Sequence, residues 1–176
     1  MTLGLILFKT KRFEEALKYF LKATEIKPDD AEYLNLLGQT YDQLGDPKIA
    51  EKCLKKAIKA DQNYAVGYYD LGVVLAKDKE RQKEAARCFN LAIELEPDLE
   101  WPYYSLACLY NLAGKKLKAL EYLKLSLEKG LHNRAYIDAD HDLDSLREEP
   151  RFKKLMNEYF GDKLGGGKKR KSRQGK

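Results

Sequence analysis

Few side chains in this sequence could act in catalysis. The 176 residues include two histidines, His132 and His141, and three cysteines, Cys53, Cys88 and Cys108. Hydrolysis or group transfer requires a nucleophile beside a base, or a metal that activates the substrate. Both histidines lie toward the C-terminal end, and the sequence offers no such constellation. We therefore assign no catalytic residue and expect a protein that is not an enzyme.

A run of carboxylates surrounds one histidine and raises the question of a metal site. His141 stands among Asp138, Asp140, Asp142 and Asp144. This alternation is similar to a calcium loop, but the internal glycine and the terminal glutamate of that motif are missing. Aspartates also cap helices and form turns, which explains the run more simply. We expect no metal and no cofactor.

The cysteine pattern and the hydropathy bear on the compartment. The cysteines are odd in number, widely spaced and without a C-x-x-C pair. This argues against a disulfide framework and fits a reducing compartment. The apolar opening, residues 1–8, is short and lacks a basic leader, and no run approaches the roughly 18 apolar residues of a membrane span. We expect a soluble, cytoplasmic protein.

Positive charge is concentrated at the C-terminal end. Residues 161–176 hold seven Lys or Arg and one Asp, a net +6 against +5 for the whole chain, so the remaining 160 residues carry −1. This tail is expected to be disordered. Its basic residues could contact nucleic acid, ribosomes or an anionic membrane, or form a nuclear import signal in a eukaryote. They could equally be a solubilising end, and no aromatic residues interleave to stack on bases. The basic residues are Lys168, Lys169, Arg170, Lys171 and Arg173.

Small and apolar residues recur along the chain at a fixed stride, which is the sequence signature of a repeat protein. Four sets share the spacing four, three and five, and successive sets begin 34, 35 and 34 residues apart. The sets are Ala16, Phe20, Ala23 and Pro28; Ala50, Leu54, Ala57 and Gln62; Ala85, Phe89, Ala92 and Pro97; and Ala119, Leu123, Ser126 and Leu131.

A second series precedes each set. Gly4, Gly38 and Gly72 are spaced by 34 residues, and Ala107 follows 35 residues later. The extra residue is expected in the charged turn 77–83. A glycine inside a helix costs about 1 kcal/mol relative to alanine. We therefore expect each of these positions to face a neighbouring helix at close range.

These two series resemble the tetratricopeptide repeat, a helix–turn–helix unit of 34 residues, over roughly residues 1–133. Gln62 and Leu131 stand where the family often has proline, and Ala107 stands in for glycine. The resemblance implies an all-α fold, a right-handed superhelical solenoid of antiparallel helix pairs. The expected division is a first repeat at 1–30 that lacks its opening turn, repeats at 31–64, 65–99 and 100–133, capping helices at 134–160 and the tail at 161–176.

Turn residues predict several helix ends. Gly45 suits a left-handed cap, Asp46 an N-cap and Pro47 a first helical turn. Acidic residues after Pro28 and Pro97 could cap the following helices; these are Asp29, Asp30 and Asp98.

The period is lost after the fourth repeat. The stretch 134–160 is predicted to form short helices that cover the exposed apolar face of the last repeat, as a solenoid requires for solubility. The residues expected to cover that face are Leu143, Leu146, Phe152, Leu155 and Tyr159.

In the family that this sequence resembles, the first helices of successive repeats line a concave groove that receives a segment of a partner. Projection of the helical period predicts the inward residues Asn35, Gln39, Val66, Tyr69, Val73, Trp101, Tyr104 and Cys108. In the incomplete first repeat, Met1 and Leu5 are the corresponding positions. Tyrosine and tryptophan are frequent interface anchors, and the two amides could bond a peptide backbone. Alternatively, Trp101 and Tyr104 pack against the terminal cap.

Two functions follow from these features. The first is a protein–protein interaction scaffold or adaptor that holds a peptide or helix of a partner in the groove. The alternative is a component of a nucleic-acid or ribosome-associated complex that is engaged through the basic tail.

Overall fold

The computed structural model describes residues 2–161, so Met1 and the basic tail residues 168–173 lie outside the described part of the chain. Within it the chain is helical and contains no strand. No helix in this range is long and apolar enough to cross a membrane. The elements are α1 (Thr2–Lys9), α2 (Phe13–Ile26), α3 (Ala31–Gln43), α4 (Pro47–Ala60), α5 (Ala65–Ala76), the 3-10 helix η1 (Lys79–Arg81), α6 (Gln82–Leu95), α7 (Glu100–Leu112), α8 (Lys116–Glu128), α9 (Arg134–Ala139), the 3-10 helix η2 (His141–Leu143), α10 (Asp144–Arg147) and α11 (Pro150–Phe160).

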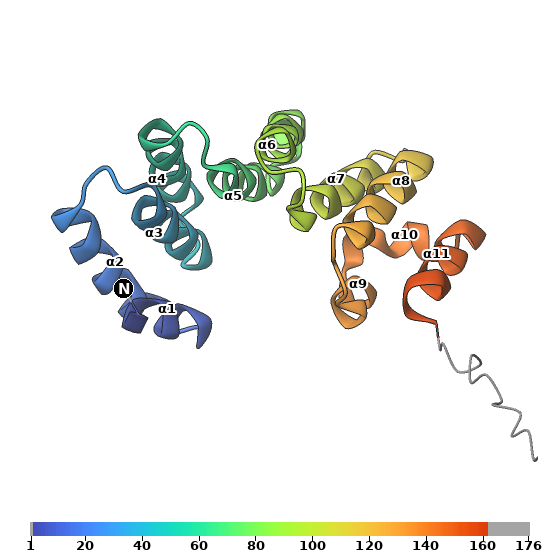
Figure 1. Ribbon diagram of the computed structural model, residues 1–176, viewed down its shortest axis with the longest axis horizontal. Helices are drawn as coiled ribbons and strands as arrows, with labels where there is room; N and C mark the ends of the chain where they lie inside the picture. The colour runs from blue at the N-terminus through green and yellow to red at the C-terminus, as the bar shows by residue number, and fades with distance from the viewer. Residues whose placement is uncertain (1, 162–176) are drawn as a thin grey trace, which may run out of the picture.

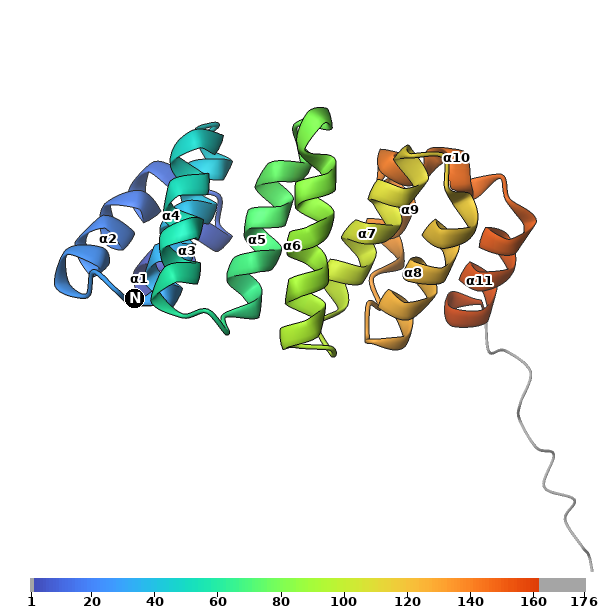
Figure 2. The same ribbon diagram turned by 90° about the horizontal axis from the view of Figure 1, so that it is seen from above.

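The first eight helices form four consecutive pairs that stack into an arch (Figure 1). Each second helix also packs against the first helix of the next pair, as α4 does against α5 and α6 against α7. Viewed from above, the pairs lie side by side in a row (Figure 2). The first helices α3, α5 and α7 therefore line the inner side of the arch, and α4, α6 and α8 lie outside them. This is the predicted all-α solenoid.

Glycines inside the first helices allow close packing within each pair. A Cβ atom at Gly38 would lie 2.8 Å from Leu54 Cγ, and one at Gly72 would lie 2.5 Å from Phe89 Cε1. Real Cβ atoms do not approach other heavy atoms so closely. The larger side chain of the second helix thus occupies the volume that the glycine leaves, as the spacing of the two series predicts.

The turn between α3 and α4 follows the prediction in part. Gly45 takes the left-handed conformation, with φ +86°, and Pro47 begins α4. Asp46 occupies the N-cap position, but its side chain makes no capping hydrogen bond, so this part of the prediction is wrong. The backbone carbonyl of Asp46 instead accepts the first helical bonds of α4, from the amides of Ile49 and Ala50.

The three other candidate N-caps have different outcomes: Asp30 rather than Asp29 holds the N-cap position of α3, and Asp98 does not cap α7. Asp30 caps α3, and its carboxylate accepts from the Tyr33 amide at 3.2 Å. Asp98 does not cap α7, because Lys129 Nζ donates to its carboxylate at 2.7 Å and Leu99 holds the N-cap position. An ion pair with a residue 31 positions later has replaced the local bond.

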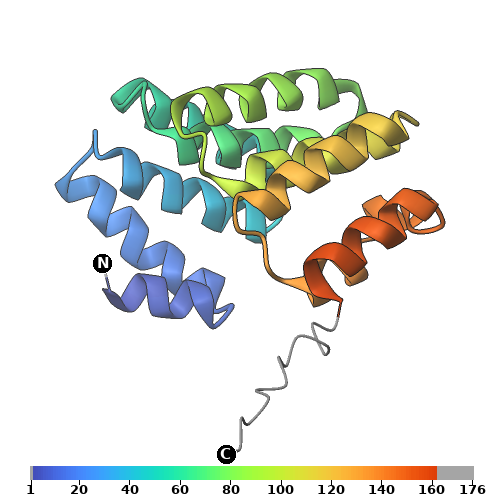
Figure 3. The same ribbon diagram turned by 45° about the vertical axis from the view of Figure 1, so that its right-hand side comes forward.

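The segment that follows α8 closes the end of the stack. Leu143, Leu146, Phe152 and Leu155 are buried in one cluster with side chains of α7 and α8, and Tyr159 packs against that cluster. Figures 2 and 3 show α11 beside α8 at this end. These contacts support the prediction that this segment covers the end of the stack.

A buried asparagine ties the cap to the last pair. Asn111 Nδ2 donates to the Asp142 carbonyl at 2.7 Å, and Ser145 Oγ donates to Asn111 Oδ1 at 3.0 Å. Both bonds span more than 30 residues, so they fix η2 and α10 against α7.

Candidate functional site

The eight predicted groove residues lie on the three inner helices. Asn35 and Gln39 are one turn apart on α3, Val66, Tyr69 and Val73 follow on α5, and Trp101, Tyr104 and Cys108 lie on α7. Gln39, Val66, Tyr69, Val73 and Trp101 are partly exposed. Asn35, Tyr104 and Cys108 are 2%, 3% and 7% exposed, so they belong to the interior beneath the groove more than to its surface.

An apolar cavity of about 450 Å³ opens between α5 and α7. Five predicted residues line it, together with other residues of α5 and α7 and with residues of α6, α9 and the turns beside them. The predicted residues in its lining are Tyr69, Val73, Trp101, Tyr104 and Cys108. Val66 does not line this cavity, and Asn35 and Gln39 lie farther along the arch.

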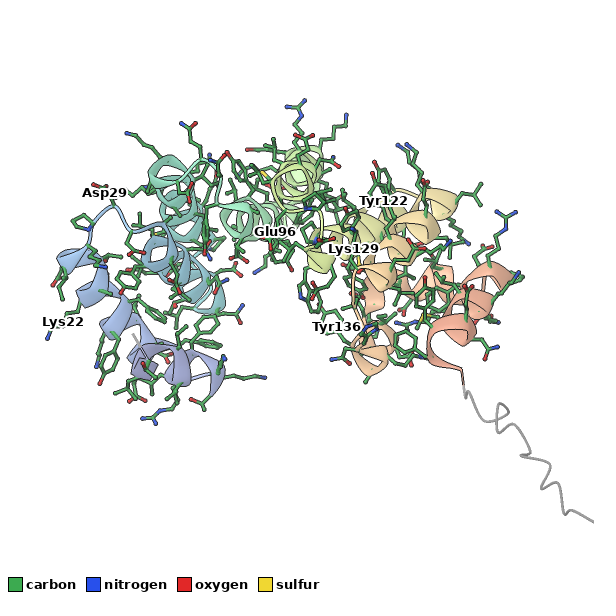
Figure 4. All side chains as sticks on the ribbon, viewed as in Figure 1. Lys22, Asp29, Glu96, Tyr122, Lys129 and Tyr136 are labelled. Carbon is green, nitrogen blue, oxygen red and sulfur yellow. The ribbon has the colours of Figure 1, made fainter. Side chains whose placement is uncertain are left out.

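One wall of the cavity is aromatic and includes a residue that the sequence did not indicate. The ring centroid of Tyr136 on α9 lies 5.2 Å from that of Trp101 and 5.5 Å from that of Tyr104. Figure 4 shows Tyr136 on the side of α9 that faces the hollow of the arch. Trp101 and Tyr104 therefore pack against the terminal segment and also line the cavity.

The base of the cavity is polar on the side of α9. Tyr104 Oη donates to Asp140 Oδ2 at 2.7 Å, and Cys108 Sγ donates to the same oxygen at 3.7 Å. Burial raises the pKa of both the Tyr104 hydroxyl and the Cys108 thiol, and the nearby Asp140 charge raises them further. Cys108 is consequently a protonated donor at neutral pH rather than a thiolate nucleophile.

Three of the four carboxylates around His141 have structural partners. Asp140 Oδ1 caps η2 by accepting from the Asp142 amide at 2.9 Å. Asp138 pairs with Arg134 at 2.7 Å, and Asp144 pairs with Arg147 at 2.9 Å. The Cys108, Asp140 and Asp142 side chains bring three potential ligand atoms within 4.8 Å of one another, but Asp140 already accepts hydrogen bonds on both oxygens.

A smaller pocket of about 230 Å³, with polar and apolar residues in its lining, adjoins the apolar cavity along the arch. Val73 lines both. The polar residues in its lining are Gln39, Asp42, Gln43 and Asp70, and Phe8 and Val74 contribute apolar walls. We call it the Asp70 pocket.

The amides predicted to bond a peptide backbone are turned toward Asp70. Asn35 Nδ2 donates to Asp70 Oδ2 at 2.7 Å, and Gln39 Nε2 donates to the same oxygen at 2.6 Å. Burial raises the pKa of Asp70 to about 6, although these two hydrogen bonds act in the opposite direction. Sequence reasoning missed Asp70 because it lies on α5, beside the predicted Tyr69 but one position around the helix.

Known proteins resemble this chain in both sequence and fold. Two family models, each described as tetratricopeptide repeat, match residues 1–63 and 35–100. The human protein O-mannosyl-transferase TMTC3 is 32% identical over 144 residues, which cover 74% of this chain but 16% of TMTC3. This chain thus spans a small part of that relative's length.

Two solved structures share the arrangement of helices. MamA superposes with a TM-score of 0.67 at 28% identity, covering 89% of this chain and 94% of MamA. YrrB, described as a TPR protein with an unusual peptide-binding site, superposes with a TM-score of 0.63 at 23% identity, covering 77% of this chain and 70% of YrrB. With the repeat spacing and the stacked helix pairs, these matches show that the chain belongs to the tetratricopeptide repeat family, whose fold supports protein-interaction scaffolds.

Proposed function

We propose that this protein is a non-enzymatic scaffold whose concave side binds a peptide or a helical segment of another protein. The observation that supports this function best is the apolar cavity of about 450 Å³ between α5, α7 and α9. A concave, largely apolar site with a few polar groups is the usual form of a recognition site.

The lining of the cavity suits an anchor side chain. Tyr69, Val73 and Trp101 remain partly exposed although they lie on the inner helices. Large side chains that enter an aromatic pocket contribute most of the binding free energy of many interfaces. The likeness to YrrB supports a peptide ligand by analogy. Three buried, unpaired cysteines are consistent with action in the cytoplasm.

The basic tail supports the second candidate function, attachment to a nucleic-acid or ribosome-associated complex. Residues 161–176 carry a net charge of +6. If the tail made that attachment, replacement of its basic residues by glutamine would abolish binding, and binding by the wild type would weaken steeply with salt. The groove hypothesis predicts capture of a protein partner that survives replacement of the tail charges and does not weaken steeply with salt.

The main test compares partner capture by single-residue variants of the full chain. We expect Tyr69→Ala to reduce recovery of the specific partner at least about tenfold, since it removes one aromatic wall of the cavity. Leu91→Ala is the matched control, because Leu91 is 40% exposed on the outer helix α6 and does not line the cavity. Circular dichroism should show equal helical content in all three proteins. Equal recovery by Tyr69→Ala and the wild type would reject the groove as the binding surface.

A further inference from the structure

The polar half of the concave side presents hydrogen-bond acceptors and few donors. The NH₂ groups of Asn35 and Gln39 are both directed to Asp70 Oδ2. Their amide oxygens are therefore turned away from the carboxylate. Asn35 Oδ1 is buried and has no hydrogen-bond partner among the described residues. The side chains with acceptor oxygens that line the Asp70 pocket itself are Gln39, Asp42, Gln43 and Asp70.

Asp70 also carries a negative charge that the described part of the chain leaves without a cation. Its two partners are neutral amides, and no ion pair to it is found within residues 2–161. The nearby Asp42 is already paired with Lys77 at 2.6 Å, so that lysine is engaged elsewhere. A partly buried carboxylate without a counter-charge is costly. The raised pKa of Asp70, about 6, has the same physical origin in burial.

We propose that the occupant of the groove inserts an arginine or lysine side chain into the Asp70 pocket while a nearby apolar side chain fills the adjoining cavity. This inference depends on the proposed function, since it specifies the chemistry of the bound segment. A guanidinium group has donors and no acceptor, and it forms short, charge-assisted bonds with a carboxylate. It therefore complements the acidic side of a pocket that is lined by Asp42 and Asp70. Phe8 also lines the pocket and offers an aromatic ring near the bound cation.

The two sites adjoin closely enough for one short segment to occupy both. Val73 lines both the Asp70 pocket and the apolar cavity, so the two sites share a wall. We assign the occupant to another protein rather than to this chain's own basic tail. Residues 162–176 contain one large apolar residue, Leu164, and no aromatic residue. The adjoining cavity, by contrast, is lined by five aromatic residues, Tyr69, Phe89, Trp101, Tyr104 and Tyr136.

The experiment begins with a random 12-residue peptide library displayed on phage and selected on the immobilised full chain. Recovered peptides are synthesised with a fluorescent label, together with versions in which their basic residue is replaced by glutamine. Binding is measured by fluorescence anisotropy against the wild type and three variants. These are Asp70→Asn, Asp29→Asn and Tyr69→Ala. Asp29 is an exposed carboxylate in the loop before α3, as Figure 4 shows, and gives the same change of charge.

We expect the selected peptides to carry an arginine or lysine near a large apolar residue. Asp70→Asn should weaken them roughly tenfold or more, as should glutamine in the peptide, and the two changes together should cost little more than either alone. Asp29→Asn should have no effect. Asp70→Asn should remain folded, because both hydrogen bonds end on Oδ2 and an asparagine Oδ1 can accept them. The comparison of the basic peptide with its glutamine version uses the wild-type protein alone, so it tests the proposal even if Asp70→Asn does not fold.

Each other outcome rejects a defined part of the proposal. Selected peptides that tolerate glutamine and Asp70→Asn but are lost with Tyr69→Ala would reject the basic residue and leave the groove intact. A selection that yields no peptide would reject the groove function and this inference together. Displacement of the labelled peptide by a synthetic peptide of residues 162–176, dependent on Asp70, would assign the pocket to the chain's own tail and overturn the assignment to another protein.

Discussion

Asp70 joins two neighbouring inner helices through a single carboxylate oxygen. Its partners Asn35 and Gln39 lie on α3, so the three side chains fix the relative position of α3 and α5. The same carboxylate resists ionisation because it is partly buried, and its pKa rises from 3.8 to about 6. One residue therefore affects the stability of the stack and the charge of the groove.

The raised pKa predicts how stability depends on pH. The folded protein binds the Asp70 proton more tightly than the unfolded chain, so the contribution of Asp70 to the free energy of unfolding falls as pH rises from about 4 to about 6. Asp70→Asn removes this dependence. We expect the variant to gain about 1–3 kcal/mol relative to the wild type across that interval.

Urea denaturation of both proteins at pH 4 and pH 6.5 measures this difference. The low pKa of Glu51, about 2 because of its hydrogen bond with Arg81, acts in the opposite direction. It is present in both proteins and cancels in the comparison. A difference in stability between the two proteins that stays constant with pH would show that Asp70 has its ordinary pKa.

The polar contacts of the groove follow a regular separation in the sequence. Projecting each helix separately does not make use of that separation. Asn35 and Asp70 are 35 positions apart, Asp42 and Lys77 are 35 apart, and Tyr104 and Asp140 are 36 apart. Equivalent positions of successive first helices are neighbours in a stack with a 34-residue stride. A polar residue that lies 35 or 36 positions after a polar residue of an inner helix is thus a candidate hydrogen-bond partner. The direction in which an amide group points depends on the packed structure and could not be predicted.

At the scale of elements, the small residues were the most predictable feature. A glycine inside an amphipathic helix has a local cost that only close packing can offset, and Gly38 and Gly72 indeed face Leu54 and Phe89. The N-caps were less predictable. An aspartate before a helix can accept a hydrogen bond from the local backbone or from a distant lysine. Asp98 accepts from Lys129.

The contact at Gly72 gives a prediction for the helix pair α5 and α6. Gly72→Ala should raise helix propensity by about 1 kcal/mol but should destabilise the protein by about 1–3 kcal/mol overall, because its Cβ would overlap the Phe89 ring. Urea denaturation measures the net effect. The double variant with Phe89→Leu should recover part of the loss, and a stabilising effect of Gly72→Ala alone would show that the ring can move aside.

At the scale of the molecule, the fold class followed from the repeat, since a constant stride with matched small and large residues allows one way of stacking. Within residues 134–160, Leu143 and Leu146 are buried in a cluster with side chains of α7 and α8, which supports the proposed cap. The contribution of α9 to the cavity was not predictable. Periodicity ends before α9, so its placement depends on long-range contacts such as those of Asn111.

The role of Asn111 predicts that the cap can be released separately. Asn111→Ala leaves the Asp142 carbonyl and Ser145 without their partner, and we expect a loss of about 1–3 kcal/mol. Hydrogen exchange should accelerate in α10 and α11 but not in α3 and α4. Uniform acceleration along the chain would mean that the solenoid and its cap open as one unit.

The aromatic wall formed by α9 has a thermodynamic consequence. Tyr136 and Asp140 belong to the terminal segment, and Tyr69 and Val73 belong to the repeats. A ligand that contacts both parts therefore favours the arrangement in which α9 is packed against the repeats. By thermodynamic reciprocity, packing of α9 against the repeats increases the affinity for the ligand by the same factor by which the ligand stabilises that packing. A ligand at one hundred times its Kd would slow hydrogen exchange in α9 roughly a hundredfold. Hydrogen exchange in the terminal segment would therefore report whether the cavity is occupied.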